Sequence, residues 1–236
     1  MSRNLRQVIC IDLDGPILDV SERYYRVYCD TLNLIGIAPL NKESYWILKR
    51  SRVSEREILT HSGTSDNDLV KEYLEARAKR IESAEYLLFD QVWPGTPDTL
   101  KVLRSRSALV LVTMRKSRKL LDQQLARLKL LEAFDCVLAA GTDSVANDRG
   151  EQKAQLVRDR YGNQDLVGWF VGDTETDIQS GRLLGLRTAA ITFGIRTIDH
   201  LSAVSPDVVL NSPADFQSWA RDVDSVNVKL ENGIES

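Results

Sequence analysis

Two carboxylates stand at alternate positions where the first apolar run of the chain ends. The run "VICI" (residues 8–11) is followed at once by Asp12 and Asp14, and Gly15 and Pro16 then turn the chain. Asp and Gly are common turn formers, so this stretch could simply close a strand. The alternative hypothesis is that Asp12 and Asp14 share a site with a cation.

Other apolar runs also end in residues that could do chemistry. Asp173 follows "WFVG" and Asp177 comes four residues later, Thr113 ends "LVLVT", and Lys153 stands at the start of an expected helix. Carboxylates gathered at one sheet edge repel each other by about 4 kcal/mol per pair at 4 Å and an effective dielectric of 20, so a positive partner is needed. Carboxylate oxygens suit Mg²⁺, which also takes phosphate oxygens. A metal, a lysine and a hydroxyl around one free carboxylate are typical of phosphoryl transfer.

The elements that must position these residues are short strands alternating with helices. β-branched runs that are apolar on both faces predict buried parallel strands at 8–11, 108–112, 136–139, 166–171, 188–192 and 207–210. Helical patterns separate them from Thr96 onward, with Thr96 as the expected cap and Pro97 as the first helical residue. This alternation predicts an α/β fold with a doubly wound parallel sheet. Ligands of such sheets bind at the carboxyl ends of the strands, where the polar residues fall.

One interval interrupts the alternation. Residues 16–92 show no clear strand. Their patterns are helical, and they include a capping-box spacing from Ser54 and a long helix that starts near Ser65 or Asp66. We therefore expect an all-helical domain inserted at 16–92, with hinges near residues 16–19 and 91–95. The α/β core would comprise 1–15 and 93–225, and residues 226–236 read as a polar tail.

Composition limits the possible partners and location. The 236 residues are 43% hydrophobic, enough for one core and a small second domain, and 31 basic residues nearly balance 34 acidic ones. This balance argues against nucleic acid or an anionic membrane as a partner. Cys10, Cys29 and Cys136 form no CxxC pair, which predicts neither a disulfide framework nor a zinc site. Since no apolar run approaches the ~20 residues of a membrane span, we expect a cytoplasmic protein. The sequence leaves monomer and homodimer open.

Four segments, in this order, resemble the motifs of the haloacid dehalogenase superfamily. They are "DLDG" from Asp12, "LVLVT" ending at Thr113, Lys153, and "GDTETD" from Gly172. The stretches 93–115 and 176–194 are similar to its phosphatase branch with a helical, C1-type cap, the phosphoglycolate phosphatase-like group. Each motif alone is weak, but four in order at strand ends are specific. The insertion at 16–92 matches the family's cap domain in kind and place.

The resemblance implies a role for each matching residue. Asp12 would be the nucleophile that forms an aspartyl phosphate, and Asp14 the general acid that protonates the leaving oxygen and then activates water. Thr113 and Lys153 complete the catalytic set. The substrate would be bound by Thr113, Met114, Arg115 and Lys153.

The resemblance also implies a magnesium site. Mg²⁺ would be held by the Asp12 side chain, the Asp14 backbone carbonyl and Asp173, with Asp177 either ligating the ion or steadying the set. One residue departs from the family pattern, because Pro16 stands where Thr or Val is common. Proline lacks an N–H, so a contact from that position is expected to be missing.

These observations favour a Mg²⁺-dependent phosphatase that acts on a small phosphorylated metabolite, because a cap over the site limits entry. A phosphosugar mutase uses the same residues and differs in shielding the aspartyl phosphate from water. A non-catalytic phosphate-binding regulatory protein is the second alternative, although the complete set of motif residues argues against it. A dehalogenase is disfavoured because it does not need Asp14.

Overall fold

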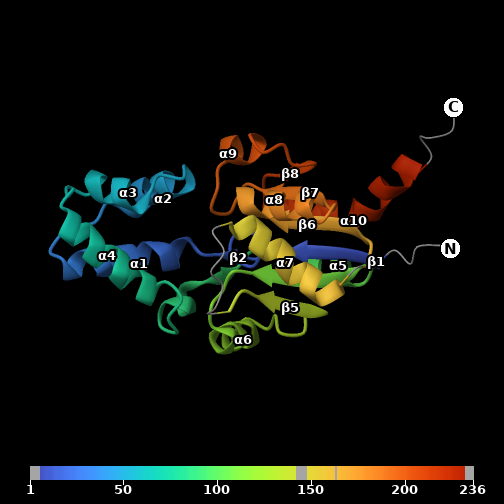
Figure 1. Ribbon diagram of the computed structural model, residues 1–236, viewed down its shortest axis with the longest axis horizontal. Coiled ribbons are helices and arrows are strands. Elements are labelled where there is room, and N and C mark those ends of the chain that lie inside the picture. Colours follow the sequence, from blue (N-terminus) through green and yellow to red (C-terminus); the bar gives the residue numbers. More distant parts are fainter. Residues whose placement is uncertain (1–5, 142–147, 163, 232–236) are drawn as a thin grey trace.

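A six-stranded parallel sheet forms the centre of the protein. The computed structural model describes residues 6–141, 148–162 and 164–231 (Figure 1). The strand order is β5-β4-β1-β6-β7-β8, and every neighbouring pair is parallel. The strands are β1 (Arg6–Ile11), β4 (Ala108–Thr113), β5 (Cys136–Ala139), β6 (Leu166–Gly172), β7 (Arg187–Ile191) and β8 (Val208–Leu210). The predicted doubly wound sheet is confirmed, and each predicted strand agrees with the observed bounds to within two residues.

The position of β1 determines where the ends of the strands meet. After β1 the chain builds the sheet outward on one side through β4 and β5, and then crosses to the other side for β6, β7 and β8. The strand order therefore reverses at β1, with β4 and β6 as its neighbours. Ligand sites in open parallel sheets lie outside the carboxyl ends of the strands at this reversal.

Helices cover both faces of the sheet, which is why its strands are apolar on both sides. Alternate residues of β1 divide between the two faces: Val8 and Cys10 pack with Val157 on one, and Ile9 and Ile11 join the larger core on the other. The first face carries α7 (Arg149–Tyr161) and α8 (Glu175–Leu183), and the second carries α5 (Thr96–Arg104), α6 (Arg118–Arg127) and α10 (Pro213–Glu231). The short helix α9 (Ile198–Ser202) lies before β8.

Two predicted ends in this domain differ from the structure. Helix α5 begins at Thr96, and its N-cap is Gly95 with φ +77°, so the prediction of Thr96 as cap is wrong by one residue. Helix α10 runs to Glu231 and so includes residues 226–231, where a polar tail was expected. Residues 232–236 of that expected tail lie outside the described part. Among the described residues, no helix has the length and apolarity needed to cross a membrane.

The interval 16–92 folds into a helical layer with a core of its own. It comprises α1 (Ser21–Leu34), α2 (Lys42–Arg50), α3 (Glu55–His61), α4 (Asn67–Arg80) and the 3₁₀ helix η1 (Tyr86–Phe89). Ser54 and Glu57 form the predicted capping box, and Asp66 caps α4. The buried core of the layer consists of Tyr28, Leu32, Tyr45, Ile58, Leu59, Val70 and Tyr73. Figure 1 shows α1–α4 at the end of the molecule to which the arrowheads of β1 and β5 point. We call this layer the cap.

The two connections between the cap and the sheet domain pair with each other. Strand β2 (Leu18–Asp19) is antiparallel to β3 (Gln91–Val92), in a small sheet separate from the main one. We expected the inserted interval to be all-helical, but it contains these two short strands. It adds no strand to the main sheet. The Trp93 indole also donates to the Gly15 carbonyl at 2.7 Å. The two linkers thus form one connected ribbon at the predicted hinge positions.

Candidate active site

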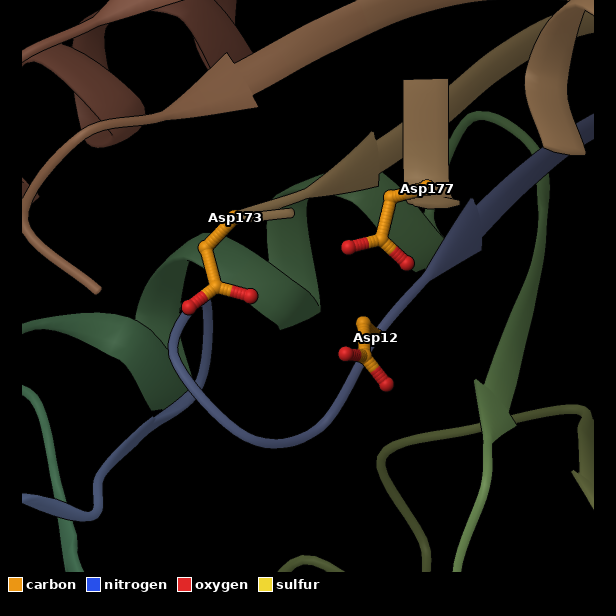
Figure 2. A group of neighbouring side chains, drawn as sticks. All are labelled: Asp12, Asp173 and Asp177. Atoms are coloured by element: carbon orange, nitrogen blue, oxygen red, sulfur yellow. The ribbon is translucent and has the colours of Figure 1, made fainter. Parts of the chain in front are cut away.

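Three carboxylates converge at the carboxyl ends of β1 and β6. Asp12 and Asp173 follow these neighbouring strands directly, and Asp177 lies in the first turn of α8. One oxygen of each lies within 4.8 Å of the others, and Figure 2 shows the three side chains directed into one space. All three residues are buried. The parallel pairing of β1 with β6 continues to Asp12, whose amide donates to the Val171 carbonyl at 3.0 Å.

Lys153 supplies the positive charge beside this group. Its Nζ lies 3.0 Å from Asp12 Oδ2 and 2.5 Å from Asp177 Oδ1. Lys153 belongs to helix α7. The N-cap of this helix is Asp148, whose side chain accepts hydrogen bonds from two amides of the first turn. Burial opposes the charge of the Lys153 ammonium, but Asp12 and Asp177 outweigh burial and raise its pKa above the ordinary value. Lys153 therefore remains protonated and joins the nucleophile candidate to the α8 carboxylate.

The charge and hydrogen bonding of this group fit a divalent cation. Three carboxylates face one ammonium group, which leaves two negative charges unbalanced. Burial raises the pKa of Asp12 to about 7 against the pull of Lys153, and burial and the neighbouring carboxylates raise the pKa of Asp173. Asp173 Oδ2 accepts from the Ile195 amide at 2.5 Å, whereas its buried Oδ1 has no hydrogen-bond partner among the described residues. A hard cation such as Mg²⁺ would satisfy this oxygen and balance the charge.

Asp177 has a different set of contacts from Asp173. Its Oδ1 accepts from Lys153, and its Oδ2 accepts from the Thr174 amide at 3.0 Å and the Thr174 hydroxyl at 2.6 Å. Both oxygens are thus engaged by the protein. This arrangement favours the steadying role over the ligand role for Asp177.

Two glycines make room for Asp173. Gly15 has φ +104°, and a Cβ atom there would lie 1.8 Å from Asp173 Oδ2. A Cβ at Gly194 would lie 2.2 Å from the same oxygen. Pro16 lies within a turn in which the Gly15 amide donates to the Leu18 carbonyl. The departure from the family pattern at Pro16 therefore falls inside a closed turn next to Asp173.

Asp14 lies in a separate cluster of charges. Its Oδ2 accepts from Arg23 of the cap at 2.6 Å, and its Oδ1 accepts from Arg115 at 2.7 Å. Burial alone would raise the pKa of Asp14, but the Arg115 and Arg23 guanidiniums outweigh burial and lower it to about 2. In this arrangement the carboxylate is held as an anion by both arginines.

A second carboxylate lies behind the two arginines. Asp90 Oδ1 lies 3.0 Å from Arg23 Nε, and Asp90 Oδ2 lies 3.3 Å from Arg115 Nη2 and 2.6 Å from Gln124 Nε2. Arg23, Asp90 and Gln124 were not among the site residues predicted from the sequence. Arg23 carried a usable signal, because it lies four residues before buried Val27 on the same helical face. No periodic pattern marks Asp90, which lies in the linker after η1.

A cavity of about 490 Å³ joins the two clusters. It is lined by Asp12, Asp14, Thr113, Met114, Arg115 and Lys153, which are all the residues predicted to be catalytic or substrate-binding. Tyr24 of the cap and Lys116 also border it. Arg115 also lines the cavity, and its buried Nε and Nη1 have no hydrogen-bond partner among the described residues. The size suits a small molecule.

Known proteins are similar to this chain in sequence and in fold. The family model of haloacid dehalogenase-like hydrolases matches residues 7–185. A phosphoglycolate phosphatase of Synechococcus elongatus is 30% identical over 210 residues, covering 89% of this chain and 95% of that protein. The pyrophosphatase PpaX of Bacillus pumilus is 27% identical over 228 residues, covering 92% and 97%. A solved haloacid dehalogenase-like family protein of Streptococcus pneumoniae shares the fold, with a TM-score of 0.66 and 18% identity over 91% of this chain and 98% of that one.

Proposed function

The chain belongs to the haloacid dehalogenase-like hydrolases, and from that premise we propose that it is a Mg²⁺-dependent phosphatase acting through an aspartyl phosphate on Asp12. One observation carries the proposal: the Asp12 carboxylate lines a cavity beside Lys153, and Asp12, Asp173 and Asp177 together carry more negative charge than Lys153 balances. A buried carboxylate next to a fixed cation can attack a phosphoryl group whose charge the same site neutralises.

The first step transfers the phosphoryl group to the protein. Thr113 and Lys153 hold the phosphoryl oxygens, and an Asp12 carboxylate oxygen attacks phosphorus. The bond from phosphorus to the leaving oxygen breaks, and that oxygen takes a proton from Asp14. Because two arginines bind Asp14 in the described arrangement, Asp14 must release one of them before it can carry this proton.

The second step hydrolyses the aspartyl phosphate. A water molecule attacks phosphorus while Asp14 accepts its proton, and the bond from phosphorus to the Asp12 oxygen breaks. Inorganic phosphate and the free Asp12 carboxylate result. The Asp12 and Asp173 side chains and the Asp14 carbonyl would hold Mg²⁺. The ion would neutralise charge on the phosphoryl group.

The cavity supports a small anionic substrate. Its wall carries the cationic residues Lys153 and Arg115, and two of the relatives are named as a phosphoglycolate phosphatase and a pyrophosphatase. We therefore place phosphoglycolate first among candidate substrates and pyrophosphate second.

A substrate panel tests the proposal. Phosphate release would be measured with Mg²⁺ on phosphoglycolate, pyrophosphate, hexose phosphates and nucleotides, and isomerisation of the hexose phosphates would be followed in parallel. We expect phosphoglycolate or pyrophosphate to give the highest kcat/KM. Isomerisation without phosphate release would establish the phosphosugar mutase instead. Absence of turnover on every ester, with binding of phosphate, would establish the regulatory protein.

A further inference from the structure

The loop Thr192–Arg196, which follows β7, holds Asp173 in place. The Ile195 amide donates to Asp173 Oδ2 at 2.5 Å. The backbone at Gly194 passes so close that an added Cβ would lie 2.2 Å from the same oxygen. The loop therefore holds Oδ2 of the Asp173 carboxylate, whereas the buried Oδ1 has no hydrogen-bond partner among the described residues.

The cap reaches this loop through Arg50, the last residue of α2. Arg50 Nη2 donates to the Thr192 carbonyl and also to the Arg196 carbonyl, the latter at 3.2 Å. A single amino group thus joins the two ends of the loop. Arg196 donates in return to the Lys49 carbonyl at 3.4 Å. Because Arg50 belongs to the cap and the loop to the sheet domain, these bonds form only when α2 lies against the sheet domain.

A second contact links the same loop to the linker that leads out of the cap. The rings of Phe193 and Trp93 meet edge to face, with centroids 5.4 Å apart and planes at 90°. Trp93 follows β3 and donates to the Gly15 carbonyl. The loop therefore contacts both α2 and the second linker, while its centre contacts Asp173.

We infer that Arg50 is a positioning residue that acts through loop 192–196 to orient Asp173 for a divalent cation, so that cap position and cation binding are coupled. The inference rests on the proposed magnesium site. Without Arg50 the two ends of the loop are no longer joined, and the Ile195 amide is no longer held against Asp173. Partners that orient metal ligands typically contribute 10–100-fold to metal affinity. Since coupling is reciprocal, cation binding also favours the cap lying against the sheet domain.

The test measures cation binding without catalysis. Calorimetric titration of Mg²⁺ into the substrate-free protein would compare wild type with Arg50→Gln and with Arg52→Gln. Arg52 is the control, because it also belongs to the cap and contacts the sheet domain, but its ion pair goes to Glu175 of α8 at 3.4 Å and not to a carbonyl of the loop. Glu175 also accepts from Arg196 at 3.2 Å, and Arg52→Gln leaves that bond and both Arg50 bonds in place. We expect the Mg²⁺ dissociation constant to rise about 10-fold in Arg50→Gln and to stay near the wild-type value in Arg52→Gln.

Each outcome decides a different claim. If wild type binds no divalent cation, the proposed function fails. If wild type binds Mg²⁺ and Arg50→Gln binds it equally well, or if both variants lose the same affinity, the inference about Arg50 is wrong and the proposed function stands. If Arg50→Gln fails to fold, Arg50→Lys decides the question, because lysine keeps one donor group. The Mg²⁺ affinity of Arg50→Lys must then be weaker than that of wild type but still measurable. Unchanged affinity in Arg50→Lys would then overturn the inference.

Discussion

Asp12 and Asp14 are separated by a single residue but have opposite electrostatic surroundings. Asp12 shares Lys153 with Asp177, and burial raises its pKa to about 7. Asp14 is bound by two arginines that lower its pKa to about 2 despite burial. In an extended strand, residues two positions apart point to the same side. The different surroundings of Asp12 and Asp14 therefore come from the turn at Gly15 and from the charged residues that other segments bring to each carboxylate. This separation supports different roles for the two carboxylates.

Replacing Asp12 by Asn should abolish the phosphoenzyme. The substitution removes the attacking oxygen anion and one of the proposed ligands, so turnover should fall to background. Mass spectrometry of the intact protein after mixing with substrate would show no added phosphoryl group. A labelled protein with Asn at position 12 would contradict Asp12 as the nucleophile.

Replacing Asp14 by Asn should instead trap the phosphoenzyme. General acid–base groups typically contribute ~10²–10⁴-fold, and the second step loses the base that activates water. With p-nitrophenyl phosphate, whose leaving group needs little protonation, attack by Asp12 can continue. We expect a mass gain of one phosphoryl group on the peptide that contains Asp12. Normal turnover of Asp14→Asn, or a label on another residue, would refute the assignment.

Substituting Gly15 by Ala should weaken cation binding. The new methyl group would meet Asp173 Oδ2 at 1.8 Å, at a φ of +104° that Ala tolerates poorly. Gly36→Ala is the matched control, since Gly36 has φ +73° and nothing lies within 4 Å of its added Cβ. Both variants should lose roughly 1 kcal/mol of stability from the left-handed backbone. Only Gly15→Ala should also lose Mg²⁺ affinity in calorimetry; equal affinity in the two would contradict crowding of Asp173.

At the scale of elements, a buried ion network fastens α1 to the second linker and the end of β4. Arg23 comes from α1, Asp90 from the segment after η1, and Arg115 from the residues after β4. Arg23, Asp90 and Arg115 are each at most 4% exposed. Two guanidiniums face the carboxylates of Asp14 and Asp90, so the charges balance. The network therefore supports the cap and the cavity wall together.

Removing Asp90 should destabilise the protein strongly. Breaking a buried pair from one side leaves an uncompensated charge, which typically costs 3–5 kcal/mol. We expect Asp90→Ala to lose about 3 kcal/mol in denaturant unfolding. Asp122→Ala is the control, because Asp122 pairs with Arg118 at 2.8 Å on an exposed face of α6 and such pairs contribute ~0–1 kcal/mol. Similar losses in both variants would show that the Asp90 network does not have this stabilising role.

At the scale of the whole molecule, the sheet brings distant segments to one edge and the cap closes over them. The ends of β1, β4 and β6 supply Asp12, Thr113 and Asp173, and the packing of α7 beside α8 supplies Lys153. The cap interval begins directly after Gly15 in the sequence, between β1 and α5. The first cap linker is therefore continuous with the turn that carries Asp14, so the cap and this turn of the candidate site share the same backbone.

Removal of divalent cations should abolish activity and lower stability. Excess chelator leaves the unbalanced carboxylates without a counterion, and a ligand that binds only the folded state stabilises it by mass action. We expect no phosphate release in chelator, recovery with Mg²⁺, and a higher thermal unfolding midpoint with Mg²⁺ than without. Ca²⁺ should inhibit, because it prefers more ligands and looser geometry. Full activity in excess chelator would overturn the Mg²⁺ requirement.

The sequence alone was sufficient to predict the six strands of the main sheet and the polar residues that follow them. Apolar runs and the residues at their ends are local features, so β5 was predicted with its observed bounds, Cys136–Ala139, and Asp12 and Asp173 could be placed at strand ends. The capping box of α3 is equally local. In contrast, β2 and β3 have two residues each, too few to show a period, and form only because their partners meet.

Only the tertiary structure decided which charges neutralise each other. Arg115 contacts Asp14 across 101 positions of sequence. No local pattern encodes such pairs, because an ion pair in the interior depends on which segments exclude water from one another. Arg23 is a further example, because in the sequence it is one of several basic residues in a helix, whereas in the structure it is buried and pairs with Asp14. The candidate site residues could thus be placed at strand ends from the sequence, whereas their charged partners and supporting contacts depend on the tertiary structure.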